Sequence, residues 1–469
     1  MVPQERLARP GRLFPNLCPR HLSEMRIPLA QPVLVAGART PIGRLVGSLS
    51  TIPAPALAGA AIRAALERAG ITGDQVDAVI MGSVVQAGVG PNPARLAAAS
   101  ADIPMSVPAT TVNKLCLSGL TAIAQAAQQI MVGQADVVVA GGAESMSNAP
   151  HLLPGSRRGF KYGGVDFMDA LDRDALVCGF DGISMGAATE RYQAGLGISR
   201  WAQDTFAAES HARAAAAIKA GRLAQEIVPI ILSGRNGEVT IDQDEGVRPG
   251  TTAEQLAKLP SAFSDCGTIT AGSASQLSDG ACAVVVMSKD RASQLGMSWL
   301  AGIGSYGTVA GPDPSLLSQP ARAIRDALRR DGTLRIADLD LLEINEAFAS
   351  VALASTQDLG VSGKRVNVNG GAIALGHPVG MSGARLVLTL ALELRRRGGG
   401  TGAAALCPCP VPLEYSIEWL TCAFASRSDV SCAENLIRPG GSCRWREWRC
   451  SGSGGTGVGF FPEVLPAAA

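Results

Sequence analysis

Two stretches of the chain repeat the same order of expected elements. The first is TVNKLCLSGLTAIAQAAQQIMVGQADVVVAGG at residues 111–142, and the second is RVNVNGGAIALGHPVGMSGARLVLTLALELRRRGGGTGAAALC at residues 365–407. Each passes from the end of a strand through an asparagine and a turn of small residues into an apolar helix, and then into another strand. Both helices are apolar on most faces, which predicts that both are buried. Two half-domains of one topology, packed around these helices, would bring the two turns to one centre.

The rest of the pattern alternates buried strands with amphipathic helices. The expected strands lie at residues 32–38, 76–82, 135–142 and 280–288, and the expected helices include residues 54–70 and 117–132. Strands that alternate with helices of this length predict an α/β fold with parallel sheets and helices on their faces. The pattern is looser at residues 145–271, where turns are frequent.

Composition excludes several classes of function. The chain has 469 residues, of which 47% are hydrophobic, so it can form two or three domains with a large core. Lysine and arginine together number 41 against 40 aspartates and glutamates. This balance gives no indication of nucleic-acid binding or of attachment to an acidic membrane surface. No uncharged apolar run reaches the roughly 18 to 20 residues of a spanning helix, so no membrane segment is expected.

The 11 cysteines are unevenly distributed. Those before residue 407 are widely scattered, which is typical of free thiols in a reducing compartment and favours a cytoplasmic protein. The others crowd into residues 407–450, where they form no C-x-x-C pair and have no histidine beside them. A zinc site is therefore disfavoured, and no metal is expected.

The two repeated turns contain the residues that indicate chemistry. Cys116 lies between strand and helix, where the helix beginning near Leu117 would favour a thiolate through its unpaired N–H groups and dipole. His377, one of only 4 histidines, stands at the matching position of the second turn. A neutral imidazole is a suitable base for a thiol. Taken singly, each residue also fits a structural role, as an inert buried cysteine or a core histidine.

Four segments carry a family resemblance. NKLCLSGL, GGAESMSNAP, INEAFA and NGGAIALGHPVGMSGAR resemble the signature segments of the thiolases, especially acetyl-CoA acetyltransferases and bacterial 3-ketoacyl-CoA thiolases. The similarity extends nearly continuously over residues 33–407. It implies an α/β fold of two half-domains with the same βαβαβαββ topology, packed in layers. The N-terminal domain would span residues 29–295, with a loop domain inserted at about 146–275, and the C-terminal domain residues 296–407.

The resemblance also implies an acyltransferase reaction in two steps. Cys116 would take the acyl group of an acyl-CoA as a thioester while His377 accepts its proton. Cys407 falls where the family has a second cysteine, which removes an α-proton from acetyl-CoA so that the carbanion attacks the acyl-enzyme. Asn345 would hold a water that stabilises one oxyanion together with the histidine. The other oxyanion would be stabilised by the backbone N–H groups of Cys116 and of a glycine in the final loop.

Substrate-binding residues carry over by position alone. CoA is expected as a substrate, and no cofactor is expected. Arg248 and Phe263 match residues at the adenine-nucleotide end of CoA, and Ala271 and Ser275 match residues beside the pantetheine. The remaining matches are Met185, Ala347 and Phe348. The family implies a homodimer or homotetramer. Ser184, where many biosynthetic relatives have histidine, weakens a preference for short acyl groups.

The final loop departs from the family pattern. Thiolases have a run of glycines after the second cysteine, whereas this chain has Pro408, Cys409 and Pro410. Glycine permits positive φ and close backbone approach, while proline fixes φ and restricts the residue before it. The resemblance implies an acetyl-CoA acetyltransferase as the first expectation. The alternatives are a 3-ketoacyl-CoA thiolase of broader chain length and, because of this loop, a catalytically impaired thiolase-like protein. A decarboxylating β-ketoacyl synthase is disfavoured, because it needs two histidines around its cysteine.

Both ends of the chain are atypical. Residues 1–28 are expected to be an unstructured extension or an over-long start, since the prolines and acidic residues disfavour a mitochondrial presequence. Residues 408–469 are interpreted as the product of a shifted reading frame or a misjoined gene, with an appended module as the alternative. Within them LEYSIEWL, at residues 413–420, alternates well enough to form a substitute last strand.

Overall fold

The computed structural model of the chain describes residues 29–179, 181–234, 237–311, 315–407 and 421–428, the last segment by its backbone alone. Residues 1–28, the altered loop at 408–410 and the predicted strand at 413–420 therefore lie outside the described residues. Among the described residues, no helix is long and apolar enough to cross a membrane.

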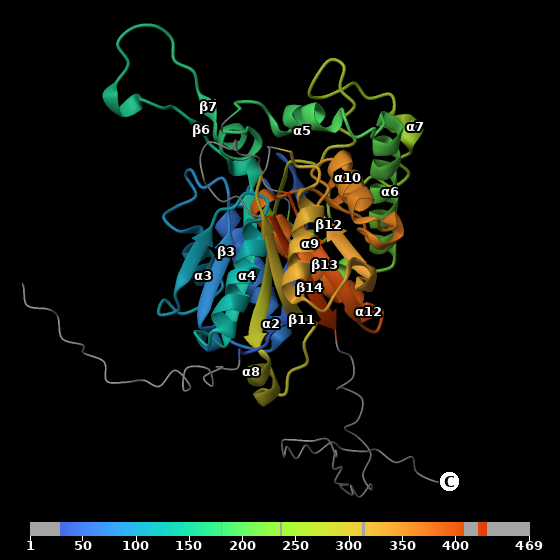
Figure 1. Cartoon of the computed structure of the whole chain (residues 1–469). Coiled ribbons are helices and arrows are strands. Elements are labelled where there is room, and N and C mark those ends of the chain that lie inside the picture. The colour runs from blue at the N-terminus through green and yellow to red at the C-terminus, as the bar shows by residue number, and fades with distance from the viewer. Residues whose placement is uncertain (1–28, 180, 235–236, 312–314, 408–420, 429–469) are drawn as a thin grey trace, which may run out of the picture. The chain divides into compact units, whose positions relative to one another are not determined.

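One large sheet runs through both halves of the described chain (Figure 1). Its strands, in spatial order, are β12 (Leu341–Ile344), β13 (Gly400–Ala405), β14 (Thr421–Ser428), β11 (Ala301–Val309), β1 (Pro32–Arg39), β10 (Ser278–Ser288), β5 (Val137–Ser145), β3 (Ala78–Gly82) and β4 (Ala109–Val112). A short strand, β2 (Gly43–Arg44), pairs with β10.

The two halves of this sheet share one strand order. The first half runs β1–β10–β5–β3 and the second β11–β14–β13–β12, outward from the β1–β11 pairing. The two outer strands of each half are parallel to each other: β5 and β3 in the first half, β13 and β12 in the second. The next strand inward, β10 or β14, is antiparallel to both of its neighbours. The repeat in the sequence thus corresponds to a repeat in topology.

The expected parallel pairing is present in β3–β4, β3–β5 and β12–β13, whereas β10, β14 and the β1–β11 pair are antiparallel. Helical crossovers make neighbouring strands parallel, as in the pairs β3–β4 and β3–β5. β10 instead follows the long segment after β5, so nothing in the local pattern fixes its direction. The strand at the place equivalent to β10 is Thr421–Ser428, which follows residues 413–420 in the chain.

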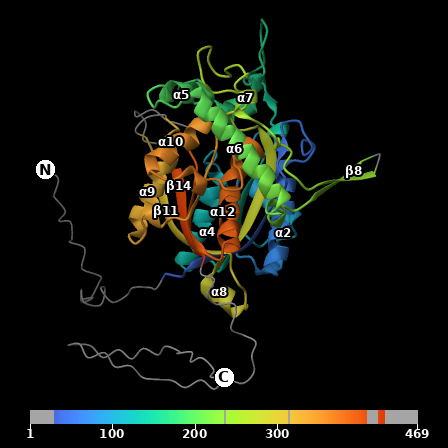
Figure 2. The same cartoon turned by 90° about the vertical axis from the view of Figure 1, so that its right-hand side faces the viewer.

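Two helices lie side by side between the halves of the sheet, α4 (Ser118–Met131) and α12 (Val379–Arg396) (Figure 2). Every residue of α12 from Val379 to Ala391 is buried, which confirms the prediction for this helix. The helices touch through their backbones, because a Cβ added at Gly383 would lie 2.5 Å from the nitrogen of Leu120. Small residues thus bring the starts of both helices together.

Further helices cover the outer faces of the sheet. Val138 and Ala140 of β5 pack with α4 and α12, whereas Val137 and Val139 point to the opposite face and pack with α2 (Ala54–Ala69) and α3 (Pro93–Ser100). On the second half, α9 (Gln319–Asp331) and α10 (Ala349–Leu359) pack against β12 and β13. The result is a layered α/β fold.

The chain between β5 and β10 holds the less regular elements. They are β6 (His151–Leu152), β7 (Met168–Asp169), α5 (Met185–Gln193), α6 (Arg200–Lys219), β8 (Ile230–Gly234), β9 (Gly237–Ile241) and α7 (Ala253–Leu256). Short helices α8 (Lys289–Gln294) and α11 (Ala372–Leu375) complete the α-helices of the described residues. The domain boundaries suggested by the sequence stay predictions.

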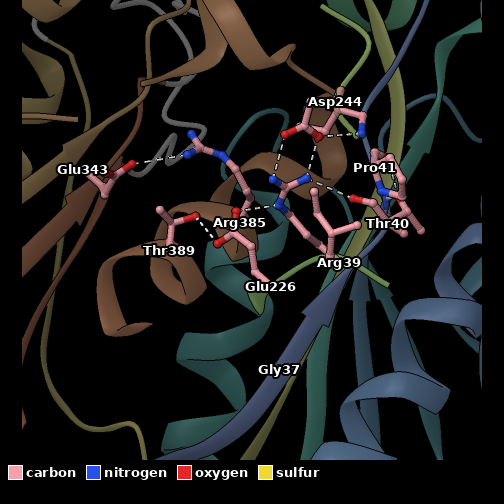
Figure 3. A network of polar contacts seen from close by, with 12 residues as sticks. Gly37, Arg39, Thr40, Pro41, Glu226, Asp244, Glu343, Arg385 and Thr389 are labelled. Carbon is pink, nitrogen blue, oxygen red and sulfur yellow. Dashed lines mark hydrogen bonds and ion pairs between the residues drawn. The ribbon is translucent and has the colours of Figure 1, made fainter. Parts of the chain in front are cut away.

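A buried ionic network joins this segment to the sheet (Figure 3). Arg39, at the end of β1, donates to both carboxylate oxygens of Asp244 at 2.6 and 2.8 Å and to Glu226 at 2.7 Å. The second oxygen of Glu226 accepts from Thr389 of α12 at 2.8 Å. Burial lowers the pKa of the Arg39 guanidinium, but Asp244 and Glu226 raise it on balance. The network therefore ties β1, the inserted segment and α12 together.

Removing Arg39 is expected to destabilise the protein strongly. Arg39→Met leaves two buried carboxylates without their cation, which costs about 3–5 kcal/mol in comparable cases. Urea unfolding of this variant should show a correspondingly lower free energy of unfolding. Arg44→Met is the control, because the Arg44–Glu245 pair is exposed and such pairs contribute about 0–1 kcal/mol. Equal losses in the two variants would contradict the importance of the buried network.

Candidate active site

Cys116 lies in a tight turn immediately before α4. Leu117 is the N-cap of this helix, and Leu115 has a positive φ of 53°. The Ser118 hydroxyl accepts from the nitrogen of Lys114 at 2.8 Å and donates to the carbonyl of Leu115 at 2.6 Å. This local bonding holds the turn in shape and presents the thiol at the start of the buried helix, where the sequence placed it.

His377, which belongs to the second half of the chain, lies beside the Cys116 thiol. Its Nε2 lies 3.2 Å from the Sγ of Cys116, although the two residues are 261 positions apart. The Ser382 hydroxyl donates to the carbonyl of Pro378 at 2.8 Å, so its oxygen accepts from Nδ1 of His377 at 2.6 Å. The proton of the neutral imidazole is thereby assigned to Nδ1, and the Nε2 lone pair faces the thiol.

Asn345 and Cys407 come from the ends of the neighbouring strands β12 and β13. Asn345 Nδ2 lies 3.3 Å from His377 Nε2, and the backbone nitrogen of Asn345 donates to Ala405 at 3.0 Å. Its Oδ1 is buried and has no partner among the described protein atoms. Cys407 is buried and lines a pocket of about 70 Å³ with Cys116 and His377. The four candidate catalytic residues therefore converge.

Burial controls the protonation of these groups. It raises the pKa of the Cys116 thiol, and the charge of Glu144 raises it further, although the backbone N–H at the turn lowers it. Burial also raises the pKa of Cys407 and lowers that of His377 to about 3, with Arg385 adding to the second shift. Burial thus opposes the effect of the helix start on the Cys116 thiol, and the imidazole that faces this thiol is neutral near pH 7.

Four predicted substrate-binding residues line the same inner pocket. They are Met185 at the start of α5, together with Ser275, Ala347 and Phe348. The backbone nitrogen of Ser275 donates to the carbonyl of Ala347 at 3.0 Å, which joins the two segments that form one wall. These residues surround the thiol with mostly apolar surface.

The other three predicted residues lie outside that pocket. Arg248 and Ala271 line a second pocket of about 240 Å³, which His211 also lines. Phe263 packs edge-on against Phe348, with ring centroids 5.7 Å apart, and its ring covers Gly186. The predicted set therefore divides into residues beside the thiol and residues farther out.

Three polar residues around the site were not found from the sequence. Ser382 orients His377, Arg385 pairs with Glu343 at 3.2 Å, and Glu144 lies beneath the two turns. Ser382 and Arg385 are polar side chains within an expected buried apolar helix, and Glu144 is a charged residue two positions after an expected buried strand; these positions were the available signal.

Removing the Ser382 hydroxyl is expected to slow acyl transfer about tenfold to a hundredfold. Ser382→Ala leaves Nδ1 of His377 buried without its partner, which costs about 1–3 kcal/mol. The rate of Cys116 acylation measures the effect. Ser350→Ala is the control, because the Ser350 hydroxyl is buried and has no hydrogen-bond partner among the described residues. A rate for Ser382→Ala equal to that of the control would contradict the orienting role.

Comparison with known proteins gives consistent matches. Family models of the thiolase N-terminal and C-terminal domains match residues 32–290 and 297–410. A probable acetyl-CoA acetyltransferase of Mycolicibacterium smegmatis is 56% identical over 357 residues, which cover 76% of this chain and 92% of that protein. The acetyl-CoA acetyltransferase of Cupriavidus necator is 50% identical over 360 residues, covering 76% of this chain and 91% of that protein.

Structural comparison extends the likeness to the fold. The crystal structure of Bacillus anthracis acetyl-CoA acetyltransferase superimposes with a TM-score of 0.81 at 38% identity, covering 85% of this chain and 99% of that one. The two family models together match most of the chain, and the halves that they match meet at the contact between Cys116 and His377. The chain belongs to the thiolase family.

Proposed function

We propose that this protein is an acyl-CoA C-acyltransferase that exchanges acyl groups between a 3-ketoacyl-CoA and CoA, with acetyl-CoA acetyltransferase as its specific activity. The observation that carries the proposal is the 3.2 Å contact between Cys116 Sγ and His377 Nε2, beside a pocket that also contains Cys407. The names of the relatives at about half identity support the acetyl group as the unit transferred.

The first step forms the acyl-enzyme. The Cys116 sulfur attacks the thioester carbonyl while its proton passes to His377 Nε2, so no free thiolate is needed beforehand. The carbon–sulfur bond to CoA then breaks, and the departing sulfur takes the proton from His377. Asn345 supports this step through its contact with Nε2, and its unpaired Oδ1 is suited to accept from a water.

The second step forms a carbon–carbon bond. Cys407 first gives its thiol proton to His377, which is neutral again after the first step, and the resulting thiolate removes an α-proton from acetyl-CoA. The carbanion attacks the acyl group on Cys116, the bond to the Cys116 sulfur breaks, and this sulfur takes the proton held by His377 as the 3-ketoacyl product leaves. Thiolysis of a 3-ketoacyl-CoA follows the same steps in reverse. Two cysteines facing one pocket suit this division of work, one as nucleophile and one as base.

The inner pocket favours a short acyl group. Its volume is about 70 Å³, and Leu115, Leu316 and Phe348 form apolar walls. A 3-ketoacyl-CoA thiolase of broader chain length is the second candidate. It is favoured by Ser184, which stands where many biosynthetic relatives have histidine. The synthase alternative loses support, because His377 is the only histidine of the described chain that lines this pocket.

We also propose a homodimer or homotetramer in the cytoplasm. Between β6 and β7 the chain extends away from the sheet and exposes Phe160, Tyr162 and Phe167 (Figure 1). Such side chains are commonly covered in an assembly. Light scattering of a triple serine variant of these residues tests the assembly, and cell fractionation tests the location.

Thiolysis of acetoacetyl-CoA by the purified protein tests the proposed activity. Release of acetyl-CoA is expected with acetoacetyl-CoA and should be much slower with a 3-ketooctanoyl thioester. Equal rates with the two substrates would favour the broader thiolase. Cys116→Ala is the negative control, and release that continues in this variant would contradict the proposal.

A further inference from the structure

We infer that Glu144 is a positioning residue that holds the start of α12, and with it His377, over Cys116. It is the only charged residue of β5, and its side chain is buried. One carboxylate oxygen accepts from the nitrogens of Val84 and Gly380, both at 3.0 Å, and the other accepts from the nitrogen of Val85 at 3.1 Å. This inference rests on the proposed roles of Cys116 and His377.

The three N–H groups belong to both halves of the molecule. Val84 and Val85 follow β3 in the first half, whereas Gly380 is in the first turn of α12 in the second half. The nitrogens in the first turn of a helix have no partner within the helix and favour a negative charge. Glu144 accepts from one of these nitrogens, that of Gly380, which lies only three positions after His377 in the chain. Its carboxylate therefore links the two halves at the catalytic turn.

Close packing leaves this carboxylate little freedom. A Cβ at Gly142 would lie 2.0 Å from the carbonyl oxygen of Gly380. A Cβ at Gly380 would lie 2.6 Å from the carbonyl of Ala143 and 2.8 Å from a carboxylate oxygen of Glu144. The backbones of β5 and α12 are thus in direct contact, and the carboxylate sits in a fixed cradle beside that contact. Loss of its bonds is therefore expected to shift the start of α12 relative to β5.

The charge of Glu144 also acts on the nucleophile. The negative charge of Glu144 raises the pKa of the Cys116 thiol. His377 and Cys407 line the same pocket as this thiol. Burial raises the pKa of Glu144 itself to about 7 against the effect of the three N–H groups, and Asp279 of β10 raises it further. The carboxylate, which is the form that accepts all three bonds, therefore predominates above about pH 7.

Two substitutions separate geometry from charge. Glu144→Gln keeps the size but loses the charge, and its NH₂ group must face at least one backbone N–H. Glu144→Asp keeps the charge but is one methylene too short to reach all three nitrogens. Both variants should acylate Cys116 about tenfold to a hundredfold more slowly, as expected when one buried hydrogen bond is lost. Glu245→Gln is the control, since Glu245 is a more exposed carboxylate that accepts from Ser48 and Arg44.

The test follows alkylation of Cys116 by iodoacetamide across pH, which does not require acyltransferase activity. Glu144→Gln should shift the pH dependence of alkylation to lower pH, whereas Glu144→Asp should shift it less. The rate of acylation by acetyl-CoA in the wild-type protein should also fall below about pH 7, as Glu144 becomes protonated. This fall in rate should be absent from Glu144→Gln. If Glu144→Gln does not fold, the slower acylation of Glu144→Asp is decisive.

Wild-type acylation rates in both variants, or an alkylation profile of Glu144→Gln identical to that of Glu245→Gln, would overturn the inference. If the wild-type protein is not acylated at all, the proposed function fails, while the alkylation profiles still decide the role of Glu144.

Discussion

Replacement of His377 by alanine is expected to slow acylation of Cys116 about a hundredfold to ten-thousandfold, the usual contribution of a positioned general base. His377 Nε2 is 3.2 Å from the thiol. Its pKa is lowered to about 3 by burial, so the imidazole stays neutral and able to accept a proton across the physiological range. Without it, the thiol keeps the raised pKa that burial and Glu144 impose.

Alkylation of Cys116 by iodoacetamide measures this effect directly. In His377→Ala the reaction should be slower and its pH dependence should move to higher pH. His211→Ala is a matched control: His211 is also buried with a lowered pKa, but it accepts from the nitrogen of Arg248 and lies outside the inner pocket. An unchanged pH–rate profile in His377→Ala would refute the pairing with Cys116.

Substitution of residues 408–410 by glycine is expected to raise turnover of acetoacetyl-CoA at least tenfold. Loss of one oxyanion donor typically costs on the order of a hundredfold to a thousandfold in rate. The family places such a donor in the loop after the second cysteine, where this chain has Pro408, Cys409 and Pro410. These residues lie outside the described structure, so the prediction rests on the sequence.

A second variant separates the two effects of glycine at this loop. Alanine at positions 408 and 410 removes the restriction by proline but still disfavours positive φ. Turnover should therefore rise less than in the glycine variant. The backbone of β14 pairs with β13 and β11, so the strand that closes the second half is present. If the chain as written already matches the glycine variant, the loop is not impaired.

The sequence predicted the centre of the site well because a repeat carries geometric information. Two copies of one topology, packed through their apolar helices, place equivalent turns together, and Cys116 and His377 are indeed in contact. The periodicity of the strands and helices likewise predicted β1, α2, β3 and β5 with small errors at their ends. These features depend on local pattern, which a single sequence contains.

Other features depend on relations that no local pattern records. The direction of β10 is set by the route of the long segment before it. The bond between Glu144 and the nitrogen of Gly380 joins residues 236 positions apart. The raised pKa of Cys116 has a related origin: the helix start was visible in the sequence, but the burial that outweighs it follows from packing of the whole molecule.

The identity of the nucleophile is tested most directly by mass spectrometry. The protein is incubated with acetyl-CoA, digested, and the acetylated peptide is located in the wild-type chain and in Cys116→Ala. A single acetyl group on Cys116 is expected in the wild-type chain, and none in the variant. Acetylation that persists in Cys116→Ala, or a wild-type chain modified at Cys407 in place of Cys116, would contradict the account.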